Sequence, residues 1–298
     1  MDVRIVEVGP RDGLQNEKTP IQTPAKVSFI AALVEAGLKE IEATSFVSPK
    51  WVPQLGDASE LWPLLPAGGS YSALVPNVKG LERAVAVGVK RIALLTAASD
   101  EFTQNNINMS IEQSLKVFQE VVDGFRTANG KDGHIRGYVS TAFECPYSGR
   151  VEPAKVIKVV GRLLEMGVNE ISIGDTIGVA APAEVRSLTK MLLAETAANM
   201  LAMHFHDTYG TAIANVDAAL EMGIAAFDSS AAGLGGCPYA PGAAGNLATD
   251  DLVYFLERQG VSTGVDRARL AQASLPILKA LGKLPQAKAQ QAQLAADA

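Results

Sequence analysis

The stretch Val3-Arg-Ile-Val-Glu-Val-Gly-Pro-Arg-Asp-Gly13 decides the fold class, because it joins a short strand to a turn of informative chemistry. Residues 3–8 are a run of β-branched residues without a helical period, which predicts a strand. A doubly wound nucleotide-binding sheet carries a Gly-x-Gly-x-x-Gly turn after its first strand. The turn here lacks that fingerprint and places two ionisable residues, Arg11 and Asp12, directly after the strand. The stretch therefore favours an α/β barrel over an open doubly wound sheet.

The rest of the chain repeats the alternation of strand and helix that begins at Val3. Seven further strand-like runs are found at 39–44, 70–75, 91–96, 135–141, 169–174, 201–206 and 225–230. Between them, apolar residues recur at helical spacing over 24–36, 78–87, 110–128, 153–166, 182–198 and 212–222. Eight strands alternating with helices over about 250 residues match a (β/α)8 TIM barrel in count and length.

The C-terminal part of the chain predicts additional helices outside the eightfold unit, at 249–259 and 266–281. Residues 1–285 are therefore expected to form a single catalytic TIM-barrel domain with a C-terminal helical extension. From Gln286 the sequence is rich in Ala and Gln and has little apolar patterning. The segment 286–298 is expected to be a disordered tail.

Composition excludes several classes of partner. The net charge is −6, and no group of Lys and Arg longer than a pair occurs, so a nucleic-acid partner is not expected. No apolar stretch reaches about 20 residues, so a membrane span is not expected. The sequence begins on a strand-like run without a charged leader, and its two cysteines form no disulfide framework. These features predict a cytoplasmic protein.

The segment His204-Phe-His206 is the sharpest local signal for chemistry. In a strand, residues i and i+2 project to the same face, so both imidazoles are expected to converge on one point. Two of the chain's three histidines lie here. Hydrogen-bonded polar residues at a strand end are the alternative, but other polar residues are expected at the same barrel mouth, where active sites lie. The pair therefore predicts a metal site.

Oxygen ligands for that site are expected from Asp12 and Asn246. Two imidazoles with oxygen donors suit Mg²⁺, Mn²⁺, Zn²⁺ or Fe²⁺ rather than a sulfur-rich structural zinc. Arg11 and Asp12 could instead form a surface salt bridge. A cation beside Arg11, however, could hold the anionic oxygen of an enolate.

Other strand ends and one loop also carry ionisable residues. Glu42 ends the second strand and Asp175 the sixth. The Gly-rich segment 233–246 is neither a Walker loop nor a dinucleotide fingerprint. Its composition suits a mobile lid that carries Cys237 over the mouth, where the thiol is a candidate for proton transfer. Cys145 is expected to be structural.

Long ordered motifs give the chain a resemblance to the 3-hydroxy-3-methylglutaryl-CoA (HMG-CoA) lyase family. The resemblance extends from about Val3 to Gly282, and the motifs that carry it are Gly9-Pro-Arg-Asp-Gly-Leu-Gln-Asn-Glu17, the run 41–54, Gly174-Asp-Thr-Ile-Gly178, His204-Phe-His-Asp-Thr-Tyr-Gly210 and the Cys237 loop with Asn246. It implies a TIM barrel of a metallolyase group marked by an Asp-Arg-Glu trio. That trio maps to Asp12, Arg11 and Glu42.

The resemblance implies cleavage of (S)-3-hydroxy-3-methylglutaryl-CoA into acetyl-CoA and acetoacetate, a reaction of leucine breakdown and ketone-body formation. It implies Mg²⁺ or Mn²⁺ as cofactor and a CoA thioester as the small-molecule partner, and a homo-oligomer, dimer or larger, is expected. The implied metal ligands are Asp12, His204, His206 and Asn246. In the implied roles, Arg11 polarises the thioester carbonyl, Cys237 is the acid/base, Ser45 and Ser172 contact the CoA substrate, and Asp175 supports the metal. One departure is Asp250, where many members have Glu.

The hydroxyl proton of the substrate is expected to pass to Asp12 or His204. The nearest alternative is a lyase for a longer-chain 3-hydroxy-3-substituted glutaryl-CoA, and another is a related Claisen-type synthase. A non-haem iron oxygenase could use two histidines and a carboxylate, but the barrel argues against it. A non-catalytic binding barrel would not need Arg11, Asp12, His204 and Cys237 together.

Overall fold

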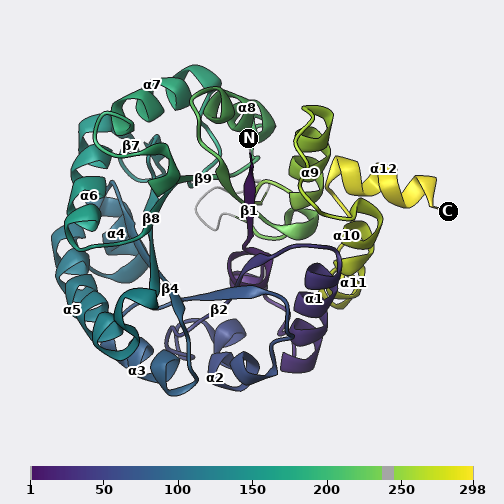
Figure 1. Ribbon diagram of the computed structural model, residues 1–298, viewed down its shortest axis with the longest axis horizontal. Helices are drawn as coiled ribbons and strands as arrows, with labels where there is room; N and C mark the ends of the chain where they lie inside the picture. Colours follow the sequence, from purple (N-terminus) through teal and green to yellow (C-terminus); the bar gives the residue numbers. More distant parts are fainter. Residues whose placement is uncertain (1, 237–244, 298) are drawn as a thin grey trace.

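Eight parallel strands close into a barrel in the order β1-β10-β9-β8-β5-β4-β3-β2 (Figure 1). The computed structural model describes residues 2–236 and 245–297. The barrel strands are β1 (Arg4–Glu7), β2 (Glu40–Ser45), β3 (Ser70–Leu74), β4 (Arg91–Ala97), β5 (His134–Ser140), β8 (Glu170–Asp175), β9 (Leu201–Phe205) and β10 (Ala226–Ser229). All eight predicted strands are present, with ends within one residue of the prediction. The predicted TIM barrel is confirmed.

A ring of helices surrounds the barrel (Figure 1). Its members are α1 (Thr23–Glu35), α2 (Ala58–Leu61), α3 (Val78–Ala86), α4 (Asp100–Ile107), α5 (Ile111–Asn129), α6 (Pro153–Glu165), α7 (Pro182–Leu192) and α8 (Ala212–Glu221). The short helices α2 and α4 and the hairpin β6 (Glu144–Cys145) with β7 (Gly149–Arg150) were not predicted. Within residues 2–236 and 245–297, no helix is both long and apolar enough to cross a membrane.

The C-terminal extension differs from the prediction in two places. The expected helix 266–281 is divided into α10 (Arg267–Ala273) and α11 (Leu275–Leu281), which follow α9 (Thr249–Arg258). Pro276 lies in the first turn of α11, where its missing N–H is harmless, but it could not continue α10 without losing a helical bond. The break at Ser274 follows from this.

The expectation of a disordered tail at 286–298 is wrong for the helix α12 (Lys288–Ala296). This helix packs on α9 and α10, and its Gln290 is fully buried. Gln290 Nε2 donates to Ala271 O at 2.8 Å and to Ser274 Oγ at 2.7 Å. Asp251 accepts from Ala289 N at 2.6 Å and so supports the start of the helix. An Ala- and Gln-rich segment favours a helix, and a buried amide anchors this one without an apolar pattern.

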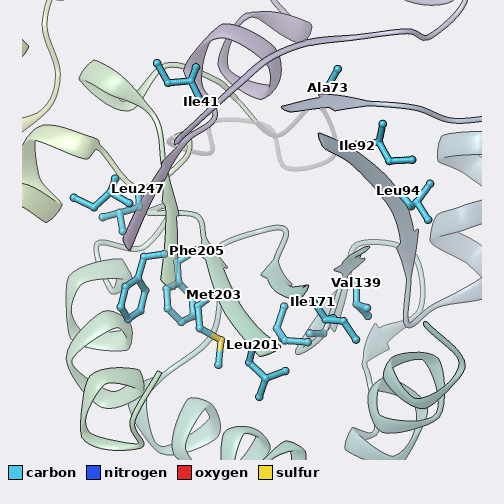
Figure 2. Close-up of a cluster of buried hydrophobic side chains, with 14 of the residues drawn as sticks. Ile41, Ala73, Ile92, Leu94, Val139, Ile171, Leu201, Met203, Phe205 and Leu247 are labelled. Atoms are coloured by element: carbon cyan, nitrogen blue, oxygen red, sulfur yellow. The ribbon is translucent and has the colours of Figure 1, made fainter. Parts of the chain in front are cut away.

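The apolar core lies between the barrel and the helix ring. Figure 2 shows Ile92 and Leu94 on the outer face of β4, and Met203 and Phe205 on that of β9. All four side chains are buried. Because strand residues alternate between two faces, the residues between these positions point into the barrel. This alternation directs His204 inward.

The barrel interior at the N-terminal end of the strands is filled by ion pairs rather than by the branched aliphatic layers that are common in such barrels. Arg4 Nε lies 2.8 Å from Glu40 Oε1, and Arg4 NH1 lies 2.9 Å from Glu170 Oε1. Arg136 Nε lies 3.1 Å from Glu170 Oε2, and its NH2 lies 2.7 Å from Asp228 Oδ1. This ion-pair network connects the closed end of the barrel to the residues beneath the mouth.

Candidate active site

The predicted metal ligands meet at the barrel mouth, the end where the strands' carboxyl termini lie. Asp12 is in a single π-helical turn, η1 (Gly9–Gly13), directly after β1. His204 is in β9, and His206 follows it and forms a bridge with Asn246. The ligand atoms of Asp12, His204 and His206 all lie within 4.8 Å of one another. The strand period that predicted the convergence of the two imidazoles is confirmed.

The spacing of these atoms fits one divalent cation. His204 Nε2 and His206 Nε2 are 3.2 Å apart, and His204 Nε2 is 3.9 Å from Asp12 Oδ2. Two nitrogens bound to one cation at about 2.1 Å lie about 3.0–3.4 Å apart for angles between 90° and 109°. Asn246 Oδ1 is buried without a hydrogen-bond partner in the described part of the chain. Its Nδ2 donates to Asp12 Oδ2 at 3.0 Å, so the amide lies beside the other three residues.

The electrostatics of the cluster favour ligand forms that bind cations. Burial opposes ionisation of Asp12, but Arg11 and the two histidines outweigh it and lower the pKa of Asp12 to about 2. Burial and the neighbouring His204 lower the pKa of His206 to about 4. At neutral pH Asp12 is therefore an anion and His206 a neutral imidazole, the states required of metal ligands.

Asp228 orients His204 from below. Its Oδ2 lies 3.2 Å from His204 Nδ1 and accepts from Ser172 Oγ at 2.7 Å. Burial opposes ionisation of Asp228, but Arg136 and His204 outweigh it and lower its pKa. An ionised carboxylate keeps the His204 proton on Nδ1, so the Nε2 lone pair faces the cluster.

Arg11 is held beside the cluster by two carboxylates. Its Nε donates to Glu42, and its NH1 pairs with Asp12. Tyr138 Oη donates to Glu42 Oε2 at 2.9 Å, and the guanidinium lies 5.5 Å from the centre of the Tyr138 ring. Glu42 is fully buried. The structure therefore places Glu42 beneath Arg11, where it orients the guanidinium.

A cavity of about 630 Å³ opens above these residues. Arg11, Asp12, His204 and His206 line one part of it, and Gly236, the last described residue before Cys237, also lines it. Apolar side chains form another wall: Leu74, Leu95 and Tyr138. Amide side chains are frequent among the remaining lining residues: Gln15, Asn16, Asn77, Asn105, Asn106 and Asn108.

The remaining predicted site residues have varied positions. Ser45 and Ser172 both line the cavity, although the Ser172 hydroxyl is engaged by Asp228 and Ser45 Oγ accepts from Val47 N at 3.2 Å. Asp175 accepts from Val179 N at 3.1 Å and Ala180 N at 3.0 Å, so its hydrogen bonds hold the loop after β8. The carboxylate that hydrogen-bonds a histidine of the cluster is Asp228.

The last residues singled out from the sequence are Asp250 and the two cysteines. Asp250 accepts from Ala232 N at 2.8 Å, and burial raises its pKa to about 6. Cys145 is buried and accepts from Ser99 Oγ at 3.0 Å, in agreement with a structural role. Cys237 lies outside the described residues.

Sequence reasoning missed Tyr138, Asp228 and Arg136. All three lie inside strands that had been predicted, at positions that alternate with buried residues such as Ile135, Val139 and Phe227. A polar or charged residue at an inward position of a barrel strand was the available signal.

These features define a TIM-barrel enzyme whose mouth carries a His-His-Asp cluster, a buried arginine and a large cavity. The family model described as HMGL-like matches residues 2–277. The chain belongs to this family, a family of lyases.

Individual relatives agree with the family model. The mitochondrial hydroxymethylglutaryl-CoA lyase of Homo sapiens is 51% identical over 292 residues, which are 97% of this chain and 89% of the human protein. The crystal structure of hydroxymethylglutaryl-CoA lyase from Pseudomonas aeruginosa superposes with a TM-score of 0.95 at 48% identity, covering 99% of this chain and 98% of that one. An HMG-CoA lyase from Acinetobacter baumannii, solved with coenzyme A and 3-methylmalate, gives a TM-score of 0.92 at 36% identity, covering 98% of this chain and 95% of that one.

Proposed function

We propose that the protein cleaves (S)-3-hydroxy-3-methylglutaryl-CoA into acetyl-CoA and acetoacetate with Mg²⁺ or Mn²⁺ as cofactor. The observation that carries this proposal is the convergence of Asp12, His204 and His206 beside Arg11 on one cavity. Membership of the HMGL-like family, with hydroxymethylglutaryl-CoA lyases as its relatives at about half identity, supports this substrate over the alternatives. Claisen-type synthesis and oxygenase chemistry are not favoured.

In this proposal Asp12, His204, His206 and Asn246 hold the cation. When bound, the cation would supply Lewis-acid catalysis at the C3 hydroxyl of the substrate. Arg11, already buried and oriented by Glu42, lies where it can stabilise the oxygen of the thioester enolate. The guanidinium needs no rearrangement as that charge develops.

The hydroxyl proton passes to Asp12 or His204. The pKa of Asp12 is about 2, which makes it a weak base. Burial lowers the pKa of His204, but Asp228 outweighs burial and raises it. Once His204 Nε2 holds the cation, its Nδ1 still carries the proton shared with Asp228, so the ring has no free lone pair and Asp12, through a carboxylate oxygen, is the acceptor that is left.

The proton that completes acetyl-CoA comes from Cys237 in this proposal. Gly236 lines the cavity and Cys237 is the next residue, which supports a thiol close to the substrate. The amide-rich rim of the cavity suits the amide groups of a pantetheine arm, and Ser45 lies on the same cavity wall. The bound coenzyme A of the Acinetobacter baumannii relative agrees with a CoA thioester as the ligand.

An assay of acetyl-CoA release tests the proposal. Purified protein is freed of metal with EDTA and then supplied with Mg²⁺ or Mn²⁺ and a panel of 3-hydroxyacyl-CoA thioesters that differ at C3. We expect release of acetyl-CoA from HMG-CoA, dependent on the added cation. Absence of cleavage of every thioester would refute the lyase, whereas preference for a larger C3 substituent would select the longer-chain alternative.

We also propose that the protein is a homo-oligomer, dimer or larger, and that it is cytoplasmic. Light scattering coupled to gel filtration tests the oligomer, and a mass equal to that of one chain would contradict it. A cytoplasmic location is tested by fractionation of the source cells.

A further inference from the structure

Glu7, the last residue of β1, is a buried carboxylate that lies outside the ligand cluster. It is fully buried. Its Oε1 accepts from Gly9 N at 2.8 Å and from Ala231 N at 2.9 Å, and its Oε2 accepts from Thr249 Oγ1 at 2.6 Å. No lysine or arginine of the described ranges offsets its charge, and burial raises its pKa to about 7. Burying a carboxylate without a cation beside it costs free energy, and the three hydrogen bonds offset that cost.

The first of the three bonds reaches the turn that carries Arg11 and Asp12. Gly9 begins that turn, and the amide that bonds to Glu7 is its own. A Cβ on Gly9 would lie 2.5 Å from Glu7 Oε1. The turn is therefore in direct contact with the carboxylate and has no room to shift toward it.

The other two hydrogen bonds of Glu7 reach the two segments that flank Asn246: the turn at Ala231, which contacts the Asn246 side chain, and the start of α9 at Thr249. Ala231 begins a short 3₁₀ turn that ends near Leu234, whose carbonyl accepts from Asn246 Nδ2 at 3.2 Å. Thr249 begins α9, three residues after Asn246. The carboxylate thus holds the segments on each side of the amide that lies beside the ligand cluster.

The turn of Arg11 and the segment 230–234 also contact each other directly. A Cβ on Gly13 would lie 2.8 Å from Ser230 Oγ and 3.0 Å from Leu234 O. A small displacement of either segment therefore has to move the other. Glu7 lies at the point where both meet α9.

We propose that Glu7 is a positioning residue that fixes Arg11 and Asp12 relative to Asn246, by joining three segments of the barrel mouth through one buried carboxylate. The expected effect of Glu7 variants on turnover rests on the proposed function. Their expected effect on cation binding rests only on the positions of Asp12 and Asn246.

Two variants separate the reach of the side chain from its charge. In Glu7→Gln, the amide oxygen accepts the two N–H bonds and the amide nitrogen donates to Thr249 Oγ1, whose proton can pass to Ser229 Oγ at 2.8 Å. In Glu7→Asp, the side chain is one methylene shorter and cannot reach all three groups. We expect Glu7→Gln to stay within threefold of the parent in kcat and in the Kd for Mn²⁺. We expect Glu7→Asp to lower kcat and raise that Kd by about tenfold or more, because small misplacements are costly in active sites.

The measurements are HMG-CoA turnover and Mn²⁺ binding by calorimetry, made well below the Tm of each variant. Leu192→Ala at the buried end of α7 is the matched control: it lowers Tm by leaving a cavity but should keep the parent Kd and kcat. Parent-like kcat and Kd in Glu7→Asp would overturn the proposal, as would a loss in Glu7→Gln equal to that in Glu7→Asp. If the parent itself does not cleave HMG-CoA, the proposed function fails, and the Mn²⁺ titrations still decide the role of Glu7.

Discussion

Replacing Asp228 with Asn changes the hydrogen bonding of His204 with little change in shape. In the parent protein, the Asp228 carboxylate pairs with Arg136 through Oδ1 and with His204 Nδ1 through Oδ2. An amide has one acceptor and one donor end, and the buried cation of Arg136 claims the acceptor. The donor end then faces His204 Nδ1, which must become the acceptor and place its proton on Nε2. That proton occupies the lone pair that faces His206.

The expected cost follows from the loss of this carboxylate–histidine bond. Changes to such outer partners typically lower metal affinity by about 10- to 100-fold, which is about 1.4–2.7 kcal/mol. We expect the Kd of Asp228→Asn for Mn²⁺ to rise by that factor, with a similar fall in kcat/KM. Calorimetric titration of the metal-free protein at pH 7.5 measures it.

The control for this variant is Ser172→Ala, which removes the other hydrogen bond to Asp228 Oδ2 and leaves the carboxylate in place. A hydrogen bond to a charged group contributes about 1.5–3 kcal/mol to stability, but Arg136 and His204 still hold the carboxylate in Ser172→Ala, so we expect less than a fivefold change in the Kd for Mn²⁺. Binding of Mn²⁺ by Asp228→Asn within twofold of the parent would refute the control of the site by Asp228 through the orientation of His204.

Four further outcomes are expected. His206→Ala should raise the Kd for Mn²⁺ at least 100-fold by calorimetry, and stoichiometric metal after gel filtration would contradict its assignment as a ligand. Cys237→Ser should lower kcat by about 10²–10⁴-fold with an unchanged Kd for Mn²⁺, and near-parent turnover would exclude its acid role. Leu95→Ala, which removes part of the apolar wall and so enlarges the cavity, should raise kcat/KM for a 3-ethyl homologue relative to that for HMG-CoA. An unchanged ratio of the two kcat/KM values would place the C3 substituent elsewhere. Glu7→Gln should gain stability over the parent as the pH rises from about 4.5 to about 7, because the unfolded carboxyl loses its proton in that window while the buried one keeps it; equal Tm differences at both ends would contradict this.

The barrel could be predicted from sequence because its signals are local. Each strand run is short and rich in β-branched residues, and each is separated from the next by a helix-length segment. The spacing of His204 and His206 likewise fixed their common face. Neither prediction needed the register between neighbouring strands.

The partners of these residues could not be predicted, because they depend on strand register across the barrel. Asp228 meets His204 only because β10 pairs with β9 at that position. Tyr138 meets Glu42, from a strand 96 residues away in sequence. Gln290 shows the same limit in the tail, where one buried amide rather than an apolar stripe fixes the helix.

The ion-pair network inside the barrel has a consequence for natural variation. Residues at the closed end of a TIM barrel generally affect stability, whereas those at the open end affect chemistry. Here Arg4 contacts Glu170, Glu170 contacts Arg136, and Arg136 contacts the Asp228 that orients His204. A substitution at Arg4, at the opposite end of the barrel from the cavity, therefore acts on the first member of a continuous series of contacts that ends at His204, a proposed ligand of the cation. We therefore expect a substitution far from the cavity to lower catalysis as well as stability.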